Sequence, residues 1–334
     1  MKYQVLLYYK YVTIDDPRKF AVRHKELCEK LGLKGRIIVA SEGINGTMEG
    51  LKEATEEYIR IMNLESGIMD IHFKKSIGNG NVFPKLSIKV RDDIVSSSIN
   101  KFVSSSFKRS FQASLIKDSR LDPNKTAGKY ITPEELHDWI HSEKRFYIVD
   151  MRNDYEQAVG YFASSMLAPF KNFRDLPKVL PLLKNLKGET IVTVCTGGVR
   201  CEKASGFLVE NGFKDVYQLY GGIVSYMEKY PNEDFLGKLY VFDGRVTIGF
   251  NLDSSDHKVV GKCKFCKSPA EEYYDCKYLH CKGKRHFISC ETCIKEYNGY
   301  CSKKCEMSSR APKDRGDLGM NKIAASVASA PSSQ

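Results

Sequence analysis

The sequence predicts an α/β multidomain protein with an N-terminal ferredoxin-like α+β domain, a central α/β domain with a parallel sheet, and a C-terminal cysteine-rich module. Strand and helix patterns alternate over residues 3–95 and again over 130–232, and eight of the eleven cysteines fall within residues 263–305. A chain of 334 residues is also too long for one ordinary compact core. With 42% hydrophobic and 28% charged residues, the composition excludes a disordered chain.

The first domain, residues 1–95, begins with a β-rich run at 4–9. A helical pattern follows at 17–31 and stops at Gly32. A buried-strand run at 35–40 leads into a predicted turn at 41–47, a second helix is expected at 51–62, and strands at 71–75 and 86–90. This order of elements predicts the ferredoxin-like arrangement.

Residues 96–129 form a serine-rich connector with seven basic and two acidic residues. Two interpretations stay open. The connector is either a solvated linker or an amphipathic segment that faces RNA, with Lys108 and Arg109 as candidate contacts.

The second domain, residues 130–232, opens with a clear helix signal. Thr132 is a candidate N-cap, Pro133 occupies the first helical position, and Glu135 completes a capping box. Short apolar strands are expected at 145–150, 190–195 and 216–219, with a helix at 201–211. This alternation predicts a parallel sheet with helices on both faces.

The loop after the strand at 190–195 carries the clearest chemical signal. The strand brings Cys195 to its C-terminal end, where open α/β sheets place their sites. Inward-turned amides at Gly197 and Gly198, the start of a helix and the Arg200 guanidinium all favour an anion in this loop. That anion can be the cysteine sulfur, so we expect a lowered pKa and a reactive nucleophile. We predict catalytic roles for Cys195 and Arg200, with an active loop formed by Thr196, Gly197, Gly198 and Val199.

Three nearby residues allow two interpretations each. Cys201 is either a thiol that resolves an oxidised Cys195 as a disulfide or a buried structural thiol. Asp150 and Arg152 either form a salt bridge that braces the domain or contact substrate.

The last domain, residues 233–306, has cysteine spacing typical of metal binding. Two Cys-x-x-Cys pairs and two wider pairs supply two complete tetrahedral sulfur sites, which predicts two structural Zn²⁺ ions. Iron–sulfur ligation is the alternative, and the pairing is either sequential or interleaved. His280 and His286 are substitute ligands if one cysteine is free. The predicted ligands are Cys263, Cys266, Cys276, Cys281, Cys290, Cys293, Cys301 and Cys305. Residues 307–334 are expected to be a disordered tail.

The motifs together resemble a known family. Cys195-x4-Arg200 is one residue shorter than the loop of cysteine phosphatases and is similar to the rhodanese loop, which suits a persulfide or another small adduct on sulfur. The stretches at 32–47, 200–205 and 287–305 resemble more narrowly the bacterial tRNA uridine 5-hydroxylase (TrhO) family, which contains a rhodanese domain. Tyr161 and Lys282 stand where that family has histidine, and we assign them no role.

The resemblance implies oxygen-dependent conversion of the wobble uridine of tRNA, at position 34, to 5-hydroxyuridine. Molecular oxygen would be a co-substrate, Cys195 matches the family's active cysteine, and no organic cofactor is evident. The alternative function is a sulfurtransferase that moves sulfane sulfur through a Cys195 persulfide. A non-enzymatic RNA-binding protein is a third possibility, and the intact Cys-x4-Arg loop argues against it.

The net charge of the chain favours a tRNA partner, and its N-terminal and apolar patterns favour a cytoplasmic location. Fifty-two Lys and Arg against 41 Asp and Glu give a net charge of +11, which favours a polyanion. No run approaches the ~18 apolar residues of a membrane span, and the N-terminus lacks a signal-peptide pattern. We therefore expect a cytoplasmic protein with no membrane partner. Candidate RNA contacts are Lys34, Arg36, Lys108, Arg109 and Lys203.

Overall fold

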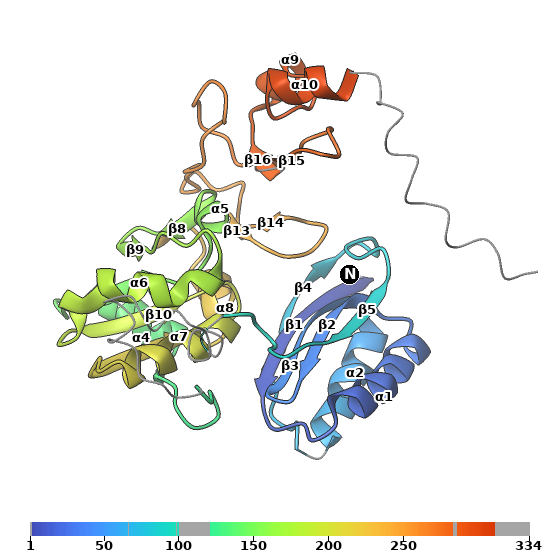
Figure 1. The fold of residues 1–334 in the computed structure, drawn as a ribbon, viewed down its shortest axis with the longest axis vertical. Helices are drawn as coiled ribbons and strands as arrows, with labels where there is room; N and C mark the ends of the chain where they lie inside the picture. Colours follow the sequence, from blue (N-terminus) through green and yellow to red (C-terminus); the bar gives the residue numbers. More distant parts are fainter. Residues whose placement is uncertain (1, 66, 98, 100–120, 283–285, 311–334) are drawn as a thin grey trace, which may run out of the picture.

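The computed structural model describes residues 2–65, 67–97, 99, 121–282 and 286–310. Three parts follow one another along the chain, and each has its own set of strands and helices (Figure 1). No helix among the described residues is both long enough and apolar enough to cross a membrane.

The first part is a five-stranded sheet with two helices on one face (Figure 1). Its strands run in the order β4-β1-β3-β2-β5, with β2 and β5 parallel and the other neighbours antiparallel. The elements are β1 (Tyr3–Tyr11), α1 (Pro17–Lys30), β2 (Lys34–Ala40), β3 (Gly43–Leu51), α2 (Lys52–Leu64), β4 (Lys74–Gly78) and β5 (Leu86–Val90). The first six elements and the β4-β1-β3-β2 order are those of a ferredoxin-like domain, as predicted, and β5 adds an edge strand.

One expected element of this domain is wrong. Residues 41–47 were predicted to be a turn, whereas the turn is brief and β3 begins at Gly43. β3 pairs with β1 on one side and β2 on the other, so it lies at the centre of the sheet.

Alternation along β1 gives the sheet two different faces. Leu6 and Tyr8 point into the core beneath α1 and α2, while Leu7, Tyr9 and Tyr11 point to the opposite face. That opposite face lies toward the second part of the chain (Figure 1).

The second part is a five-stranded, fully parallel sheet in the order β6-β11-β10-β7-β9. The prediction of a parallel sheet is confirmed. Its elements are β6 (Lys129–Ile131), α4 (Pro133–Ile140), β7 (Tyr147–Asp150), α5 (Asp154–Gln157), β8 (Gly160–Phe162), β9 (Ser165–Leu167), η3 (Phe173–Asp175), α6 (Leu176–Leu183), η4 (Lys184–Leu186), β10 (Thr190–Val194), α7 (Val199–Glu210), β11 (Asp215–Leu219) and α8 (Gly222–Lys229).

Helices cover both faces of this sheet, because its strands are apolar on both sides. Val149 and Ile191 pack in one core with α6 and α7, while Ile148 and Val192 pack in the other with α4 and α8. The predicted capping box is present: Thr132 Oγ1 accepts from the Glu135 N–H at 3.2 Å, and Glu135 Oε2 accepts from the Thr132 N–H at 2.8 Å.

The third part consists of short elements and is joined to the second by a strand pair, β8 with β12. Its elements are β12 (Phe235–Gly237), β13 (Leu239–Tyr240), β14 (Thr247–Ile248), β15 (Tyr273–Asp275), β16 (His286–Ile288), α9 (Glu291–Glu296) and α10 (Lys303–Arg310). Helix α10 includes residues 307–310, which were expected to belong to the disordered tail, and the rest of that tail lies outside the described residues.

Candidate active site

The predicted loop forms at the C-terminal end of the central strand β10. Gly198 has φ +100° and caps α7, so the chain reverses direction within three residues of Cys195. The Gly198 N–H donates to Cys195 Sγ at 3.2 Å. Gly222, at the start of α8, packs so closely that a Cβ there would lie 2.6 Å from Gly198 N. The cysteine, the glycines and the start of the helix therefore lie together, as the sequence predicted.

The surroundings of Cys195 favour its thiolate. Burial by itself would raise the pKa of this thiol, but a hydrogen bond from Cys201, the charge of Arg200 and backbone N–H groups outweigh burial and lower the pKa from 9.0 to about 6. Burial and the neighbouring Cys195 charge raise the pKa of Cys201 well above its ordinary value. Cys201 is thus the protonated donor of the pair, and Cys195 is the thiolate at neutral pH.

Cys195 is buried, although it stands at the start of a loop. Its exposed fraction is 0%, because the first domain covers the outer side of the loop. Tyr9 Oη donates to Glu202 Oε1 at 2.9 Å, and Tyr11 Oη donates to the Val199 carbonyl at 3.2 Å. A Cβ at Gly198 would lie 2.8 Å from Tyr9 Oη, so a side chain at this loop position would have to displace the Tyr9 phenol of the neighbouring domain.

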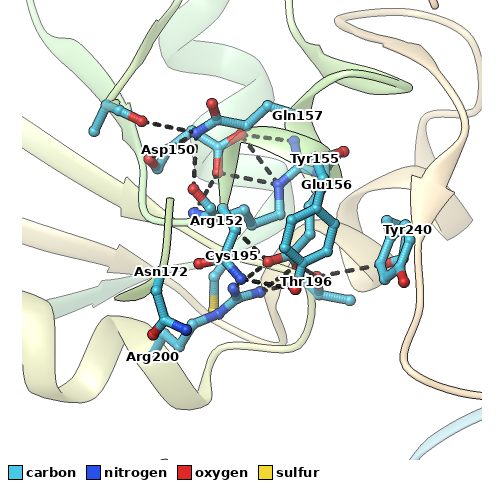
Figure 2. A network of polar contacts seen from close by, with 12 residues as sticks. Asp150, Arg152, Tyr155, Glu156, Gln157, Asn172, Cys195, Thr196, Arg200 and Tyr240 are labelled. Carbon is cyan, nitrogen blue, oxygen red and sulfur yellow. Dashed lines mark hydrogen bonds and ion pairs between the residues drawn. The ribbon is translucent and has the colours of Figure 1, made fainter. Parts of the chain in front are cut away.

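Arg200 is held by a carboxylate that we had not assigned to the site (Figure 2). Its Nη1 and Nη2 atoms donate to the two oxygens of Glu156 at 2.6 and 2.8 Å, and Nη2 also donates to Thr196 Oγ1 at 3.2 Å. Glu156 is fully buried and is the third residue of α5. The signal available in the sequence was the capping box from Asn153 to Glu156. Arg200 therefore acts on Cys195 through its charge, while its donors are largely occupied.

Asp150 and Arg152 form the bracing salt bridge. Arg152 Nη2 lies 2.6 Å from Asp150 Oδ2, both side chains are 0% exposed, and Nη2 also donates to the Gly160 carbonyl at 2.7 Å. The pair fixes the turn between β7 and α5, from which Glu156 reaches Arg200 (Figure 2).

A pocket of about 410 Å³ opens between the first domain and this loop. That volume lies within the range of small-molecule sites. Polar side chains from all three parts of the chain line it together with Cys195, and the aromatic rings of Tyr155, Phe173 and Phe242 form part of its apolar wall. The amides and cations in the lining include Asn45, Asn153, Asn172, Arg36, Lys74, Arg174, Arg200 and Arg245. Lys74 and Arg245 gave no signal in the sequence, because their place depends on how the domains meet.

The candidate RNA contacts fall into three groups. Lys34 and Arg36 are exposed on β2, and Arg36 also lines the pocket. Lys108 and Arg109 lie outside the described residues. Lys203 contradicts the expectation, since it is 2% exposed and its ammonium pairs with Glu42 at 2.8 Å and Asp93 at 3.1 Å. A phosphate cannot reach it, and its role is to join α7 to the first domain.

The eight clustered cysteines converge in two groups of four. Cys263, Cys266, Cys290 and Cys293 form one group, and Cys276, Cys281, Cys301 and Cys305 form the other. The pairing is therefore interleaved. Sulfur–sulfur distances are 3.7 Å for Cys266–Cys290 and 3.5 Å for Cys301–Cys305. His286 Nδ1 forms a hydrogen bond with Asp275 Oδ1 at 3.0 Å, and neither His280 nor His286 joins these groups within the described residues.

Comparison with known protein families divides the chain in the same way. Residues 3–94 match the family described as UPF0176 acylphosphatase like domain, residues 132–229 match the rhodanese-like domain, and residues 236–306 match the rhodanase C-terminal family.

Curated relatives are similar over nearly the whole chain. A protein of Cytophaga hutchinsonii is 37% identical over 304 residues, which cover 91% of this chain and 90% of the relative. One of Staphylococcus carnosus is 39% identical over 308 residues, with the same coverage, and one of Bacillus licheniformis is 38% identical over 312 residues, covering 92% and 90%. All three are named tRNA uridine(34) hydroxylase.

Proposed function

This chain belongs to the tRNA uridine(34) hydroxylase family, and on that premise we propose that it converts the wobble uridine of tRNA to 5-hydroxyuridine in the pocket beside Cys195. The observation that carries the proposal is the identity of 37–39% over about nine tenths of both chains. The reaction replaces the C5–H of uracil by C5–OH. With molecular oxygen as the co-substrate, it consumes two electrons and two protons from a donor and releases water.

Cys195 is the residue that we assign to the chemistry. A thiolate can add to C6 of uracil, which makes C5 electron-rich and ready to take an oxygen atom. With a pKa near 6, the sulfur is ionised at neutral pH, and the Gly198 N–H and the Arg200 charge hold it in place. After C5 has taken the oxygen, loss of the C5 proton expels the thiolate and restores the ring.

The pocket supports this assignment by its composition. Uracil offers two carbonyl acceptors and one N–H donor, and the amides of Asn45, Asn153 and Asn172 supply both donors and acceptors. Apolar rings beside them suit a base that has been turned out of the anticodon loop.

We also propose that each cysteine group binds one Zn²⁺. Zinc–sulfur bonds of about 2.3 Å in a tetrahedron place the sulfurs about 3.8 Å apart, close to the 3.5–3.7 Å found within these groups. Four thiolates fill the coordination sphere, so the ions would stabilise the fold of the third part and leave no open position for substrate. A cytoplasmic location follows from a tRNA substrate.

Nucleoside mass spectrometry of tRNA from a deletion strain tests the function. The intact gene should restore 5-hydroxyuridine, Cys195→Ser should not, and Cys28→Ser should, because Cys28 lies in the first-domain core away from the pocket. Serine has nearly the volume of cysteine, so the first variant should keep its fold. Restoration by Cys195→Ser would show that the nucleophile is wrongly assigned. The sulfurtransferase alternative, which the comparisons do not favour, predicts unchanged 5-hydroxyuridine and a missing thiolated nucleoside.

A further inference from the structure

A buried lysine of the first domain reaches the reactive loop of the second. Lys74 begins β4 and lies opposite Leu7 of β1, so both side chains point to the face that covers the loop. Its Nζ donates to the Gly197 carbonyl at 2.9 Å and lies 4.7 Å from the centre of the Tyr9 ring. Lys75, the next residue, points the opposite way and pairs with Glu56 at 2.7 Å in solvent.

The charge of Lys74 has no direct counter-ion. It is 6% exposed, and among the residues that the structure describes no carboxylate lies within ion-pair distance of its Nζ. A buried ammonium without a salt-bridge partner opposes folding, and a neutral residue would hold the Gly197 carbonyl at lower cost. Burial lowers the pKa of Lys74 to about 8, while the charges of Cys195 and Glu202 oppose that shift. The amine is thus mainly protonated at neutral pH.

The position of Lys74 fits a negative charge that arises during the reaction. It lines the same pocket as Cys195. An ammonium has three donors, of which one is used by Gly197 and the Tyr9 ring takes part of the remaining charge. At least one donor is therefore available to a molecule in the pocket.

We propose that Lys74 is a catalytic residue of this site, whose ammonium donates to the uracil O4 atom when the Cys195 sulfur bonds to C6. The inference rests on the proposed function. In this step the sulfur lone pair forms the Sγ–C6 bond, and the C5=C6 π pair moves onto C5 and O4. No proton, oxidant or reductant is consumed. The ring acquires one negative charge, which the preorganised ammonium stabilises.

Three variants separate this role from that of a simple clamp on the loop. Lys74→Gln keeps a donor for the Gly197 carbonyl and removes the charge, and Lys74→Arg keeps the charge. Lys52→Gln, at the exposed start of α2 on the helix-covered side of the same domain, is the matched control. Each is expressed in the deletion strain, and 5-hydroxyuridine in tRNA is followed by mass spectrometry after induction. The tRNA Kd and the thermal midpoint are measured on the purified full chains.

We expect Lys74→Gln to slow 5-hydroxyuridine formation about 100-fold, the effect of removing one charged donor from a developing oxyanion. Its thermal midpoint should not fall and its tRNA Kd should change little. Lys74→Arg should recover part of the rate, and Lys52→Gln should match the parent. A parental rate for Lys74→Gln would overturn the inference. So would equal inactivity of both Lys74 variants with lowered thermal midpoints, which indicates a clamp. If the parent chain itself forms no 5-hydroxyuridine, the proposed function fails, and this inference fails with it.

Discussion

Replacing Glu156 with glutamine tests how Arg200 is held. The pair makes two charge-assisted hydrogen bonds of 2.6 and 2.8 Å, and the side chains are 0% and 7% exposed. Removing one charge of such a buried pair costs about 3–5 kcal/mol, because the other charge stays buried. Glutamine retains the shape of glutamate and one acceptor oxygen. We therefore expect a loss at the lower end of this range, about 3 kcal/mol in the free energy of unfolding.

A single tryptophan makes this loss measurable. Trp139 lies in α4 of the second domain and packs against Phe146 and Tyr217, so its fluorescence during guanidinium unfolding reports on that domain. The matched control is Glu189→Gln, which breaks an exposed pair with Arg145. That change should alter the free energy of unfolding by about 0.5 kcal/mol or less.

The same substitution should also change the reactivity of Cys195. Without the Glu156 carboxylate, the Arg200 charge acts on the sulfur with no counter-charge, so the pKa of Cys195 should fall below about 6. The thiolate is the reactive form, so alkylation by iodoacetamide should persist to lower pH than in the parent. Unfolding energies equal to those of the control, or an upward shift of the alkylation midpoint, would refute this account of the site.

Two further predictions concern metal and RNA. Metal analysis should give about two zinc ions per chain. Cys266→Ser and Cys301→Ser should each lower the zinc content by about one, because these residues belong to different groups. Iron, or no metal with four disulfides, would contradict the zinc sites. Arg36→Glu should weaken tRNA binding and reduce the slope of log affinity against log salt by about 0.7–0.9. The control Lys30→Glu, at the exposed end of α1, should have a smaller effect on both quantities. Equal effects of the two variants would show that Arg36 is not part of the RNA-binding surface.

Local patterns predicted those parts of the molecule that depend on neighbours in sequence. The capping box at Thr132, the loop from Cys195 to Arg200 and the cysteine-rich end could all be found because spacing alone defines them. Even there the pairing of the cysteines stayed open, since sequential and interleaved groups use the same spacings.

The missed features depend on contacts between distant segments. β3 contains three glycines and has little intrinsic preference for a strand, yet a Cβ at Gly46 would lie 2.6 Å from the Tyr8 ring, so packing demands glycine in the middle of a sheet. Lys203 was predicted to contact RNA because it is a cation beside the active loop. Glu42 and Asp93, more than 100 residues earlier, bury it instead.

The contact of Tyr9 with Gly198 also has a consequence for the redesign of these two domains. The phenol of one domain occupies the space that a side chain on the loop of the other would need. A rhodanese-like domain transplanted from another protein would bring a loop whose outer surface was never shaped to this tyrosine. The loop and the strand that carries Tyr9 are therefore fitted to each other, and a designer who wishes to move this loop to a new scaffold must carry both.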